Sequence, residues 1–538
     1  MISARFVAAI LSLVLVVANV TAQRRGTYSN PVVAGDFPDP SVIRVGADYW
    51  ATTTTGTWAP FFPLLHSRDL VNWRIAGYVF QQRPAWAARD FWAPEIIQDR
   101  GRFFVYYAAR RNEGANKRGT LCVAVATAAR AEGPYTDHGP LVCQDIGSID
   151  PFFVRDERGE PYLIWKEDGN DRNQPTVVWA QPLTADGTKL TGQRKEILRN
   201  DAPWERNVTE GSYILRRGAW FYHFYAGSAC CGRSCDYAVG VARAHKLLGP
   251  WEKYKQNPII TANKDWQCPG HGSIVTTPDG RTFLLYHSYR QRRDTFNIGR
   301  EAILDEVQWG ADGWPIVNGG QGPSSVAPAP LGIAQSTDAG EFFDDFNRPE
   351  LKLEWQWPMF SKQTVLLVTL CTGHLLLGSE ENPPSDEWTG AVIARRVTSG
   401  DYVATTLVET RDSAASVRAG LAAYSWRDAA VGIAVGGGKV MLWRREGKEQ
   451  RTLASVPAPV APAVYLRMTA SAGELYRFAY GTDGRTWTEL GGPVNGSYIE
   501  GAHVALTAGG ALGKAAIFDW IRITPQRPTS ATGDGRYE

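Results

Sequence analysis

Short apolar runs separated by glycine turns recur five times in the first 320 residues of the chain. In each repeat a run ends at a glycine, and an aromatic-rich apolar run follows directly. This pattern predicts two antiparallel strands joined by a tight turn. The five turns and the strands that follow them span Gly46–Trp50, Gly101–Tyr107, Gly159–Trp165, Gly218–Tyr225 and Gly280–Tyr286.

Each strand pair is preceded by a short phrase whose first residue changes from repeat to repeat. The successive steps between phrases are 54, 57, 60 and 61 residues. A near-constant period of this length fits one four-stranded sheet with its loops per repeat. Five such sheets around an axis form a five-bladed β-propeller, which we expect over residues 28–320. The phrases begin at Asp39, Ala93, Asp150, Glu210 and His271.

A different pattern begins after residue 320. Residues 321–340 are rich in Gly, Pro, Ser and Ala, as is typical of a linker. Residues 341–525 contain short alternating strands separated by glycine-rich turns, which predicts a β-sandwich. Helix signals are few, so we expect an all-β chain that ends in a polar, frayed tail at residues 526–538.

The first 22 residues have the features of a secretory signal peptide. Arg5 precedes an apolar run over Phe6–Val17, and the small residues of Val20–Ala22 form a cleavage site. A retained membrane anchor is the alternative, although this apolar run is short for a bilayer span. We therefore expect residues 1–22 to be removed and the mature protein to be secreted or periplasmic, with no membrane contact after cleavage.

Length, net charge and aromatic content limit the number of domains and the possible binding partners. A length of 538 residues fits two to three domains. The net charge is +2 and no basic stripe is present, which argues against nucleic acid as a partner. The 20 Trp and 21 Tyr residues often lie beside turns. Most are expected to pack between sheets, and a minority can stack on sugar rings.

Seven cysteines occur in a chain whose expected destination permits disulfides. Cys122 and Cys143 flank an expected hairpin of the second repeat, and we predict that they form a pair. Disulfides among four others would rigidify loops at the mouth of the propeller, with connectivity that stays open. A zinc site is an alternative, although its ligand spacing would be unusual. These four are Cys230, Cys231, Cys235 and Cys268.

Three of the five phrases begin with an acid, namely Asp39, Asp150 and Glu210. Equivalent positions of all repeats lie around one channel, so the three carboxylates are expected to converge. Burial of carboxylates costs desolvation free energy, which makes a packing role hard to justify. A glycosidase needs one carboxylate to deprotonate water, a second to protonate the leaving oxygen and a third to tune that acid. Asp36 and Glu95 lie off the repeat position, and we expect no direct catalytic role for them.

The five-repeat pattern, headed by Asn30–Ser41, resembles glycoside hydrolase family 43 over about residues 30–320. The resemblance implies a five-bladed propeller with Asp39 as general base, Glu210 as general acid and Asp150 as the group that tunes and orients the acid. It also implies inversion at the anomeric carbon, which requires about 6.5–9.5 Å between the base and acid carboxyl groups. Supporting phrases are Ser67–Trp73, Phe91–Ile96, Ser148–Pro151, Thr209–Gly211, Gly270–Ser273 and Asp312–Val317.

The same resemblance suggests roles for four neighbouring residues. His271 is similar to a histidine that in this family lies near a calcium ion or water cluster in the channel; a buried histidine without metal is the alternative. Arg300 matches an inner-strand arginine that contacts the sugar or the acids, with a structural ion pair as the alternative. Trp92 would line the sugar pocket, and Trp58 would stack on sugar, unless they only pack. No organic cofactor is implied.

The second region resembles the concanavalin-like sandwich of many exo-acting members, in which a loop can close one side of the active site. A carbohydrate-binding module is the alternative for this region. The insert Ala229–Cys235 departs from the usual family pattern, and we expect it to alter the rim of the pocket and therefore the substrate.

These observations predict a secreted inverting exo-glycosidase. Its substrates would be polysaccharides or oligosaccharides that end in α-L-arabinofuranosyl or β-D-xylosyl units. A β-D-galactofuranosidase and an endo-arabinanase are chemically close alternatives. A propeller that binds glycans without cleaving them is the alternative from another class of protein.

Overall fold

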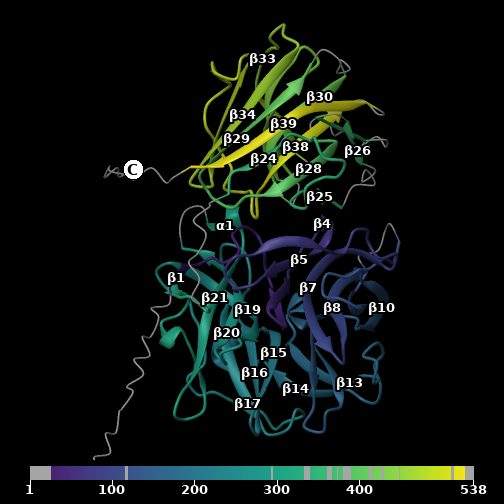
Figure 1. The fold of residues 1–538 in the computed structure, drawn as a ribbon, viewed down its shortest axis with the longest axis vertical. Helices are drawn as coiled ribbons and strands as arrows, with labels where there is room; N and C mark the ends of the chain where they lie inside the picture. Colours follow the sequence, from purple (N-terminus) through teal and green to yellow (C-terminus); the bar gives the residue numbers. More distant parts are fainter. Residues whose placement is uncertain are drawn as a thin grey trace, which may run out of the picture.

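The chain forms two β-rich bodies, which appear in the computed structural model as a lower purple-to-teal part and an upper green-to-yellow part (Figure 1). The described residues are 26–114, 119–291, 295–331, 340–359, 366–371, 373–379, 389–410, 416–425, 429–447, 449–510 and 514–526. The expected signal peptide at residues 1–22 therefore lies outside the described residues, as does the expected tail beyond residue 526.

Five four-stranded antiparallel sheets, one for each repeat, make up the N-terminal body. The first sheet consists of β2 (Ser41–Val45), β3 (Asp48–Thr52), β5 (Phe61–Ser67) and β6 (Arg74–Phe80). The second consists of β7 (Ala87–Asp99), β8 (Arg102–Arg111), β9 (Leu121–Ala128) and β10 (Thr136–Cys143). The third consists of β11 (Ser148–Arg155), β12 (Pro161–Glu167), β13 (Val177–Pro182) and β14 (Lys195–Arg199).

The last two sheets complete a closed ring. The fourth consists of β15 (Thr209–Arg217), β16 (Trp220–Gly227), β17 (Ala238–Ala244) and β18 (Glu252–Lys253). The fifth consists of β19 (Trp266–Thr276), β20 (Thr282–Arg290), β21 (Glu301–Trp309) and β22 (Pro315–Val317). The first strands of the sheets contact one another in the cyclic order β2, β7, β11, β15, β19 and back to β2. The predicted five-bladed propeller is therefore confirmed.

A left-handed residue recurs where each inner strand begins to face the axis. Left-handed backbone is rare for residues that carry a side chain. Because it occurs at the same place in every blade, the geometry of the inner strand requires it. In β7, β11, β15 and β19 this residue lies in a β-bulge, where the register with the next strand shifts. The positive φ values are 55° at Asp39, 44° at Ala93, 54° at Asp150, 61° at Gly211 and 42° at His271.

This register corrects the sequence alignment in the fourth repeat. The equivalent of Asp39 and Asp150 is Gly211, not Glu210, because Gly211 carries the positive φ and follows the last regular pair of β15. Glu210 pairs with Ala226 and lies one residue earlier. It therefore reaches the axis from the position that Trp92 holds in the second repeat.

Aromatic side chains fill the spaces between the blades, as expected for most of them. Between the first two blades, Phe61 and Phe91 have ring centroids 4.2 Å apart, and Phe62 lies 5.3 Å from Tyr107. All four side chains are buried. Burial of one such side chain contributes about 1.5–3 kcal/mol, so these contacts hold the neighbouring blades together.

The C-terminal body is a sandwich of two antiparallel sheets. The larger sheet contains β26 (Leu366–Cys371), β27 (His374–Ser379), β39 (Ala515–Pro525), β29 (Tyr402–Glu409), β34 (Ala463–Ser471), β35 (Leu475–Gly481) and β36 (Thr488–Glu489), with β24 (Phe342–Asp344) and β37 (Val494–Asn495) beside them. The smaller sheet contains β28 (Ala391–Arg396), β38 (His503–Gly510), β30 (Val417–Tyr424), β31 (Ala430–Gly436), β32 (Lys439–Glu446) and β33 (Glu449–Pro457).

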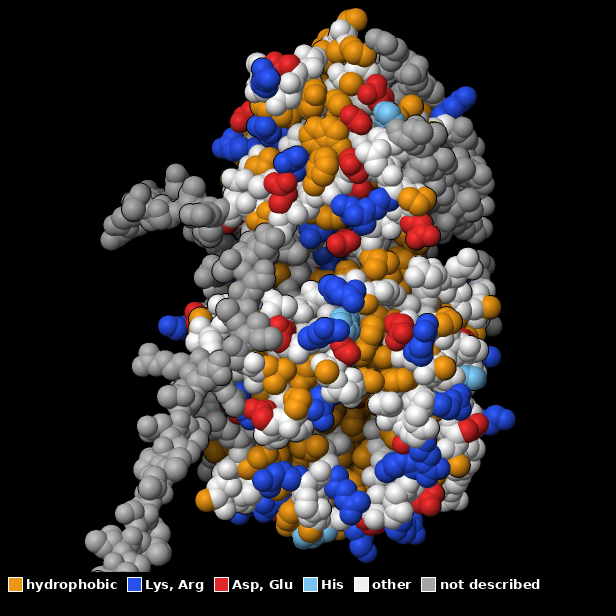
Figure 2. Space-filling view, viewed as in Figure 1, with side chains coloured by type: hydrophobic (Ala, Val, Ile, Leu, Met, Phe, Trp, Pro, Cys, Tyr) orange, Lys and Arg blue, Asp and Glu red, His pale blue; other side chains and the backbone are white. Residues whose placement is uncertain are grey.

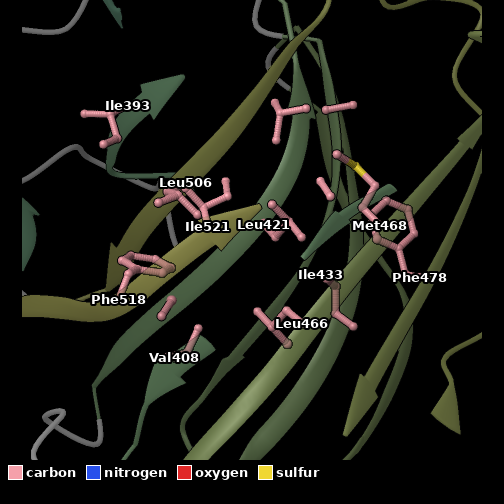
Figure 3. Close-up of a cluster of buried hydrophobic side chains, with 14 of the residues drawn as sticks. Ile393, Val408, Leu421, Ile433, Leu466, Met468, Phe478, Leu506, Phe518 and Ile521 are labelled. Atoms are coloured by element: carbon pink, nitrogen blue, oxygen red, sulfur yellow. The ribbon is translucent and has the colours of Figure 1, made fainter. Parts of the chain in front are cut away.

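The sandwich core follows from the alternation of side chains along each strand. In β34 every second residue is buried, which places Leu466 and Met468 on the inner face. They meet Leu421 and Ile433 of the opposite sheet, together with Phe518 of β39, in one apolar cluster (Figure 3). The predicted β-sandwich is confirmed.

Several segments join the two bodies. β4 (Trp58–Ala59) of the propeller pairs with β25 (Trp357–Pro358). The short helix α1 (Thr295–Ile298) lies at the junction in Figure 1. The carbonyl oxygens of Phe296 and Asn297 accept hydrogen bonds from Gly501 and Ala502 of the sandwich, at 2.8 and 2.6 Å. These bonds fix a sandwich loop against the propeller.

Part of the expected linker forms a β-strand. Within it, β23 (Val326–Pro328) pairs with β1 (Thr27–Ser29) near the N-terminus. Three short 3-10 helices complete the described elements, namely η1 (Gly169–Arg172), η2 (Pro203–Glu205) and η3 (Asn318–Gly320). The predicted Cys122–Cys143 disulfide is present between β9 and β10.

The face of the molecule drawn in Figure 2 carries charged side chains of both signs. On the side drawn in Figure 2, Lys and Arg side chains are interspersed with Asp and Glu. In the part of the chain that the structure describes, no helix has the length and apolar character needed to cross a membrane.

Candidate active site

A cavity of about 520 Å³ opens at the end of the propeller that faces the sandwich. Asp39, Asp150 and Glu210 all line it, so the structure brings the three predicted acids together. Each is buried, with less than a tenth of its surface exposed. A cavity with a few convergent ionisable groups is the usual form of an enzyme site.

Asp39 lies in a cationic and hydrogen-bonding environment. Its Oδ1 accepts a hydrogen bond from Nη1 of Arg300 at 3.1 Å, and its Oδ2 accepts one from Oγ1 of Thr54 at 2.7 Å. Burial raises the pKa of Asp39, but the charge of Arg300, together with the neighbouring His271 and His287, outweighs burial and holds the pKa well below its usual value. Asp39 is therefore a carboxylate at neutral pH.

The backbone of Asp39 is fixed by a neutral histidine. The N–H of Asp39 donates to Nδ1 of His287 at 3.1 Å. Burial lowers the pKa of His287 to about 4, so its ring is uncharged at neutral pH and Nδ1 can accept this bond. His287 thus helps to hold Asp39 in its left-handed conformation.

Asp150 lies across the channel in a less favourable environment for charge. Its Oδ2 accepts a hydrogen bond from the N–H of Gly211 at 2.9 Å. Burial, with the nearby charge of Glu210, raises the pKa of Asp150 to about 6, although His271 and Lys166 oppose this effect. The two carboxyl groups therefore titrate as a pair, and Asp150 holds a proton more readily than Glu210 does.

Glu210 is held by a buried lysine and a tyrosine. Nζ of Lys166 donates to Oε2 at 2.5 Å, and the hydroxyl of Tyr237 donates to Oε1 at 2.8 Å. Burial raises the pKa of Glu210, but the charge and hydrogen bond of Lys166 overcome it and lower the pKa below its usual value. Lys166 also donates to Oδ1 of Asp168 at 3.0 Å.

His271 lies between the two sides of the channel. Its Nδ1 is 3.7 Å from Oδ1 of Asp39 and 3.8 Å from Oδ2 of Asp150. Calcium takes six to eight oxygen ligands. Within the described ranges, no group of three or more His, Cys, Asp or Glu side chains is arranged to hold a metal ion. The side chains around His271 therefore do not form a calcium cage by themselves.

The two predicted aromatic residues differ in their surroundings. Both line the cavity. Trp92 is partly exposed, as a residue that contacts substrate needs to be. Trp58 is only 4% exposed, and its ring stacks on His503 of the sandwich with centroids 4.0 Å apart. Packing between the two bodies therefore occupies one face of Trp58.

Asp36, which we expected to have no direct catalytic role, supports Arg300. Its Oδ1 accepts a hydrogen bond from the backbone N–H of Arg300 at 2.9 Å. Asp36 lines the cavity as well, next to the sandwich residue Arg396. Glu95, the other acid set aside, is absent from the residues that line the cavity as far as the structure describes them.

Family comparison explains this arrangement. The model of the glycosyl hydrolases family 43 matches residues 28–315, which is more than half of the chain. The chain belongs to glycoside hydrolase family 43. Residues 343–524 match the concanavalin A-like C-terminal domain of β-xylosidases, which confirms the predicted type of sandwich. The protein is therefore a family 43 glycoside hydrolase that acts on carbohydrate.

Individual family 43 relatives cover most of the chain. The xylosidase/arabinosidase 43B of Humicola insolens is 30% identical over 422 residues, which cover 74% of each protein. A xylan 1,3-β-xylosidase of a Vibrio species is 26% identical and covers 87% of this chain and 91% of its own length. The crystal structure of BlXynB from Bacillus licheniformis superposes with a TM-score of 0.78 at 27% identity, over 93% of this chain and 100% of that one.

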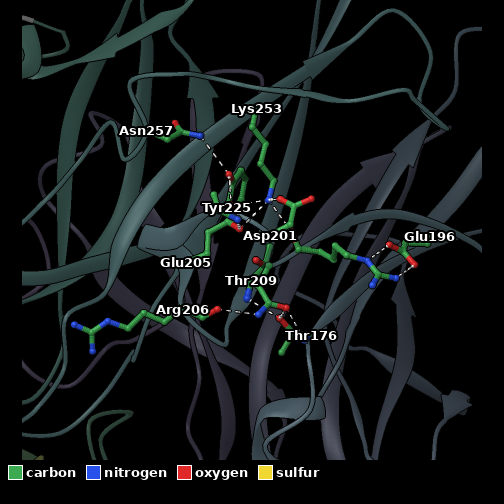
Figure 4. A network of polar contacts seen from close by, with 12 residues as sticks. Thr176, Glu196, Asp201, Glu205, Arg206, Thr209, Tyr225, Lys253 and Asn257 are labelled. Atoms are coloured by element: carbon green, nitrogen blue, oxygen red, sulfur yellow. Dashed lines mark hydrogen bonds and ion pairs between the residues drawn. The ribbon is translucent and has the colours of Figure 1, made fainter.

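A polar network behind Glu210 fixes the segment that leads into β15 of this family 43 propeller (Figure 4). The buried Glu205 accepts hydrogen bonds from Tyr225 at 2.7 Å and from Lys253 at 2.8 Å. The N–H of Thr209, next to Glu210, donates to Oγ1 of Thr176 at 2.7 Å. These bonds anchor the backbone on the entry side of Glu210, so the carboxyl group has a defined position.

Sequence reasoning missed several residues of the family 43 site. Lys166 lies near the end of the apolar strand β12, where a charged residue was the available signal, and Tyr237 directly precedes β17. The sandwich residues carried no local signal, because they reach the cavity only through docking of the two bodies. These sandwich residues are Arg396, Glu500, Gly501 and His503.

The cysteine-rich insert lies at the rim of the family 43 cavity. Cys230 and Cys231, which are adjacent in sequence, form a disulfide with each other, and Cys235 pairs with Cys268 at the start of β19. Cys230, Cys231 and Gly232 line the cavity. The predicted position of the insert at the pocket rim is therefore confirmed.

Proposed function

We propose that this protein is a secreted inverting exo-glycosidase that releases terminal β-D-xylosyl or α-L-arabinofuranosyl units from polysaccharides or oligosaccharides. In this proposal Asp39 is the general base and Glu210 the general acid. Asp150 tunes and orients Glu210, while Arg300 and Trp92 contact the sugar. The xylosidase and arabinosidase activities for which its relatives are named support pentosyl substrates.

The observation that carries this proposal is the contrast between the two sides of the channel. Asp39 is held as a carboxylate by Arg300, which suits a base that takes a proton from water. Asp150 and Glu210 form a coupled pair opposite, and burial raises the pKa of Asp150 to about 6. Such a pair takes up its first proton near pH 6, which makes a proton available to the acid side of the reaction in mildly acidic solution.

The reaction proceeds in one displacement. A water next to Asp39 attacks the anomeric carbon from the face opposite the leaving oxygen, and Asp39 takes its proton. The bond between the anomeric carbon and the glycosidic oxygen breaks while Glu210 gives that oxygen a proton. The product sugar then has the inverted anomeric configuration. Proton exchange with solvent returns Asp39 to its carboxylate and Glu210 to its acid form.

The sandwich supports an exo-acting enzyme rather than an endo-arabinanase. Its residues Arg396, Glu500 and His503 line the cavity together with the propeller acids. Its loop is held to α1 by the backbone hydrogen bonds of Gly501 and Ala502. A wall on this side leaves room for a chain end but blocks a polymer that runs through the cavity.

Secretion is part of the proposal because of the first 22 residues, in which an apolar run follows Arg5 and precedes small residues. The full chain expressed in its host is expected to lose these residues. The intact mass of the mature protein tests this, and a mass that retains them contradicts it.

Hydrolysis of four aryl glycosides in parallel tests the activity. The set contains the α-L-arabinofuranoside, β-D-xylopyranoside, β-D-galactofuranoside and β-D-galactopyranoside. Activity on a pentoside, with inverted product seen by NMR, supports the proposal. Dominant β-D-galactofuranosidase activity, a retained configuration or sugar binding without turnover overturns it.

Variants of the two acids test their roles. Asp39→Asn and Glu210→Gln change one charge at nearly constant shape, so both are expected to fold and to lose about 10²–10⁴-fold in kcat. Glu210→Gln is expected to retain more activity on aryl glycosides with good leaving groups, which need little protonation. Wild-type rates in either variant contradict the role assigned to that residue.

A further inference from the structure

The insert between β16 and β17 places an unusual apolar group at the mouth of the cavity. The Cys230–Cys231 disulfide lines the cavity, with Cys231 exposed and Cys230 half-buried. A disulfide offers two polarisable sulfur atoms and lacks strong hydrogen-bond donors. Cys230 packs against a buried apolar cluster that includes Tyr289 and Phe296, so the disulfide extends an apolar surface to the mouth of the cavity.

The insert flanks Glu210 at both of its ends. Ala226, near the end of β16, pairs with Glu210, and the insert begins three residues later at Ala229. Tyr237, which follows the insert, donates its hydroxyl hydrogen to Oε1 of Glu210. The Cys230–Cys231 disulfide is therefore carried on the same wall of the cavity as Glu210.

The insert is also immobilised. Cys235 is bonded to Cys268 of the neighbouring blade. Nη2 of Arg233 donates to the carbonyl oxygen of Ser497 at 2.6 Å and to Glu474 at 3.1 Å, both in the sandwich. Its guanidinium lies over the ring of Phe296 at 4.9 Å. A surface held from three sides loses little entropy when a ligand contacts it.

The role of Glu210 as general acid determines which part of the substrate lies on this wall. A general acid must reach the glycosidic oxygen, which joins the terminal sugar to the next unit of the substrate. The next unit therefore lies toward the side of the cavity that carries Glu210. Pyranose and furanose rings present C–H groups on one face, and an apolar sulfur pair is complementary to that face.

We propose that the Cys230–Cys231 disulfide is a contact surface for the leaving-group sugar and sets the preference of the enzyme for substrates with a second sugar unit. The proposal rests on the glycosidase function proposed above. It assigns a specificity role to two residues of the insert and no role in bond breaking.

The test compares two substrates with the same terminal sugar. A disaccharide occupies both positions, whereas the glycosyl fluoride has no leaving-group sugar. In Cys230→Ser/Cys231→Ser, the ratio of kcat/KM for disaccharide to that for fluoride is expected to fall about tenfold, the size expected when a small apolar contact in a substrate pocket is lost. Full activity on the fluoride shows that the variant is folded.

Cys122→Ser/Cys143→Ser is the matched control. It removes one disulfide from β9 and β10, outside the residues that line the cavity, and is expected to keep the wild-type ratio. An unchanged ratio in the Cys230→Ser/Cys231→Ser variant overturns the inference and leaves the proposed function standing. A wild type inactive on both substrates overturns the proposed function and this inference with it.

A second measurement avoids any dependence on the folding of that variant. In Glu210→Gln, the disaccharide is expected to slow the reduction of Cys230–Cys231 by a water-soluble phosphine, measured by alkylation and peptide mass spectrometry. The monosaccharide is expected to give no such protection, and Cys122–Cys143 serves as the internal reference. Equal reduction rates with disaccharide and monosaccharide overturn the inference.

Discussion

The ammonium group of Lys166 lies 2.5 Å from Oε2 of Glu210, and only 1% of the Lys166 side chain is exposed. The same ammonium group lies 3.0 Å from Asp168. This buried cation favours the ionised form of Glu210 and lowers its pKa. Glu210, the proposed acid, therefore gives up its proton more readily than an isolated buried carboxyl group, and Lys166 determines the upper pH limit of its action.

Lys166→Met is expected to shift the basic limb of the kcat/KM profile to higher pH. The acid must be protonated to act, and removal of the positive charge raises the pKa of Glu210, so the protonated form persists to higher pH. Rates measured from pH 4 to 9 on one aryl glycoside with a poor leaving group, which needs protonation by Glu210, give the limb directly. A basic limb that stays in place contradicts control of Glu210 by Lys166.

Lys253→Met is the matched control for this lysine variant. Lys253 also pairs with a buried glutamate, Glu205, but in the network behind β15. Loss of one partner of a buried ion pair typically costs about 3–5 kcal/mol. We expect this control to lower the stability and to leave the pH limits of activity unchanged.

Arg300→Met is expected to move the acid limb of the profile to higher pH. Asp39 must be ionised to act as a base, and Arg300 holds its pKa well below the usual value against the opposing effect of burial. Without Arg300 the carboxylate takes up a proton at a higher pH, so activity is lost earlier on acidification. Arg155→Met, which loses a surface pair with Asp99, is expected to keep the wild-type acid limb.

Trp58 and Trp92 are expected to respond differently to replacement by alanine. Trp58 is buried and stacks on His503, so Trp58→Ala is expected to cost about 3–5 kcal/mol of stability and to loosen the sandwich. Trp92 is partly exposed in the cavity, so Trp92→Ala is expected mainly to raise KM. Thermal unfolding and steady-state kinetics of both variants separate the two roles. If the two variants lose the same stability and show the same change in KM, the distinction between Trp58 and Trp92 is wrong.

Much of the propeller was predictable because its repeats impose one geometry. The left-handed position recurs at Asp39, Asp150 and His271, and each of these residues faces the axis. The fourth repeat deviates because glycine occupies the left-handed position, and the acid lies one residue earlier. A sequence alignment cannot detect this shift, since bulges are seen only in the strand register.

The rest of the site depends on contacts that sequence order does not encode. Lys166 reaches Glu210 across 44 residues of chain. Cys235 bonds to Cys268 of the next blade, and His503 enters the cavity from another domain. The charge states follow from these contacts, so the lowered pKa of Glu210 was not foreseeable from its motif.

Glu95 provides a test of buried charge that is independent of catalysis. Burial raises its pKa to about 8, opposed only by a hydrogen bond from Ser41. In the unfolded chain a glutamate has a pKa of about 4.3. The folded state therefore binds more protons between these values, and the stability of the wild type falls as the pH rises from about 4.5 toward 8.

Glu95→Gln is expected to remove this loss, because glutamine is neutral at every pH. At pH 8 the variant is expected to melt about 2–4 °C above the wild type, which corresponds to about 1 kcal/mol in a domain of this size. At pH 4.5 the two melting temperatures are expected to coincide. Glu205→Gln is the contrasting control, since Glu205 forms a buried ion pair with Lys253 and loss of that pair is expected to lower the melting temperature at pH 8. If Glu95→Gln and the wild type melt at the same temperature at pH 8, ionisation of Glu95 does not destabilise the folded protein. Glu95 would then carry its charge in the folded protein without a loss of stability.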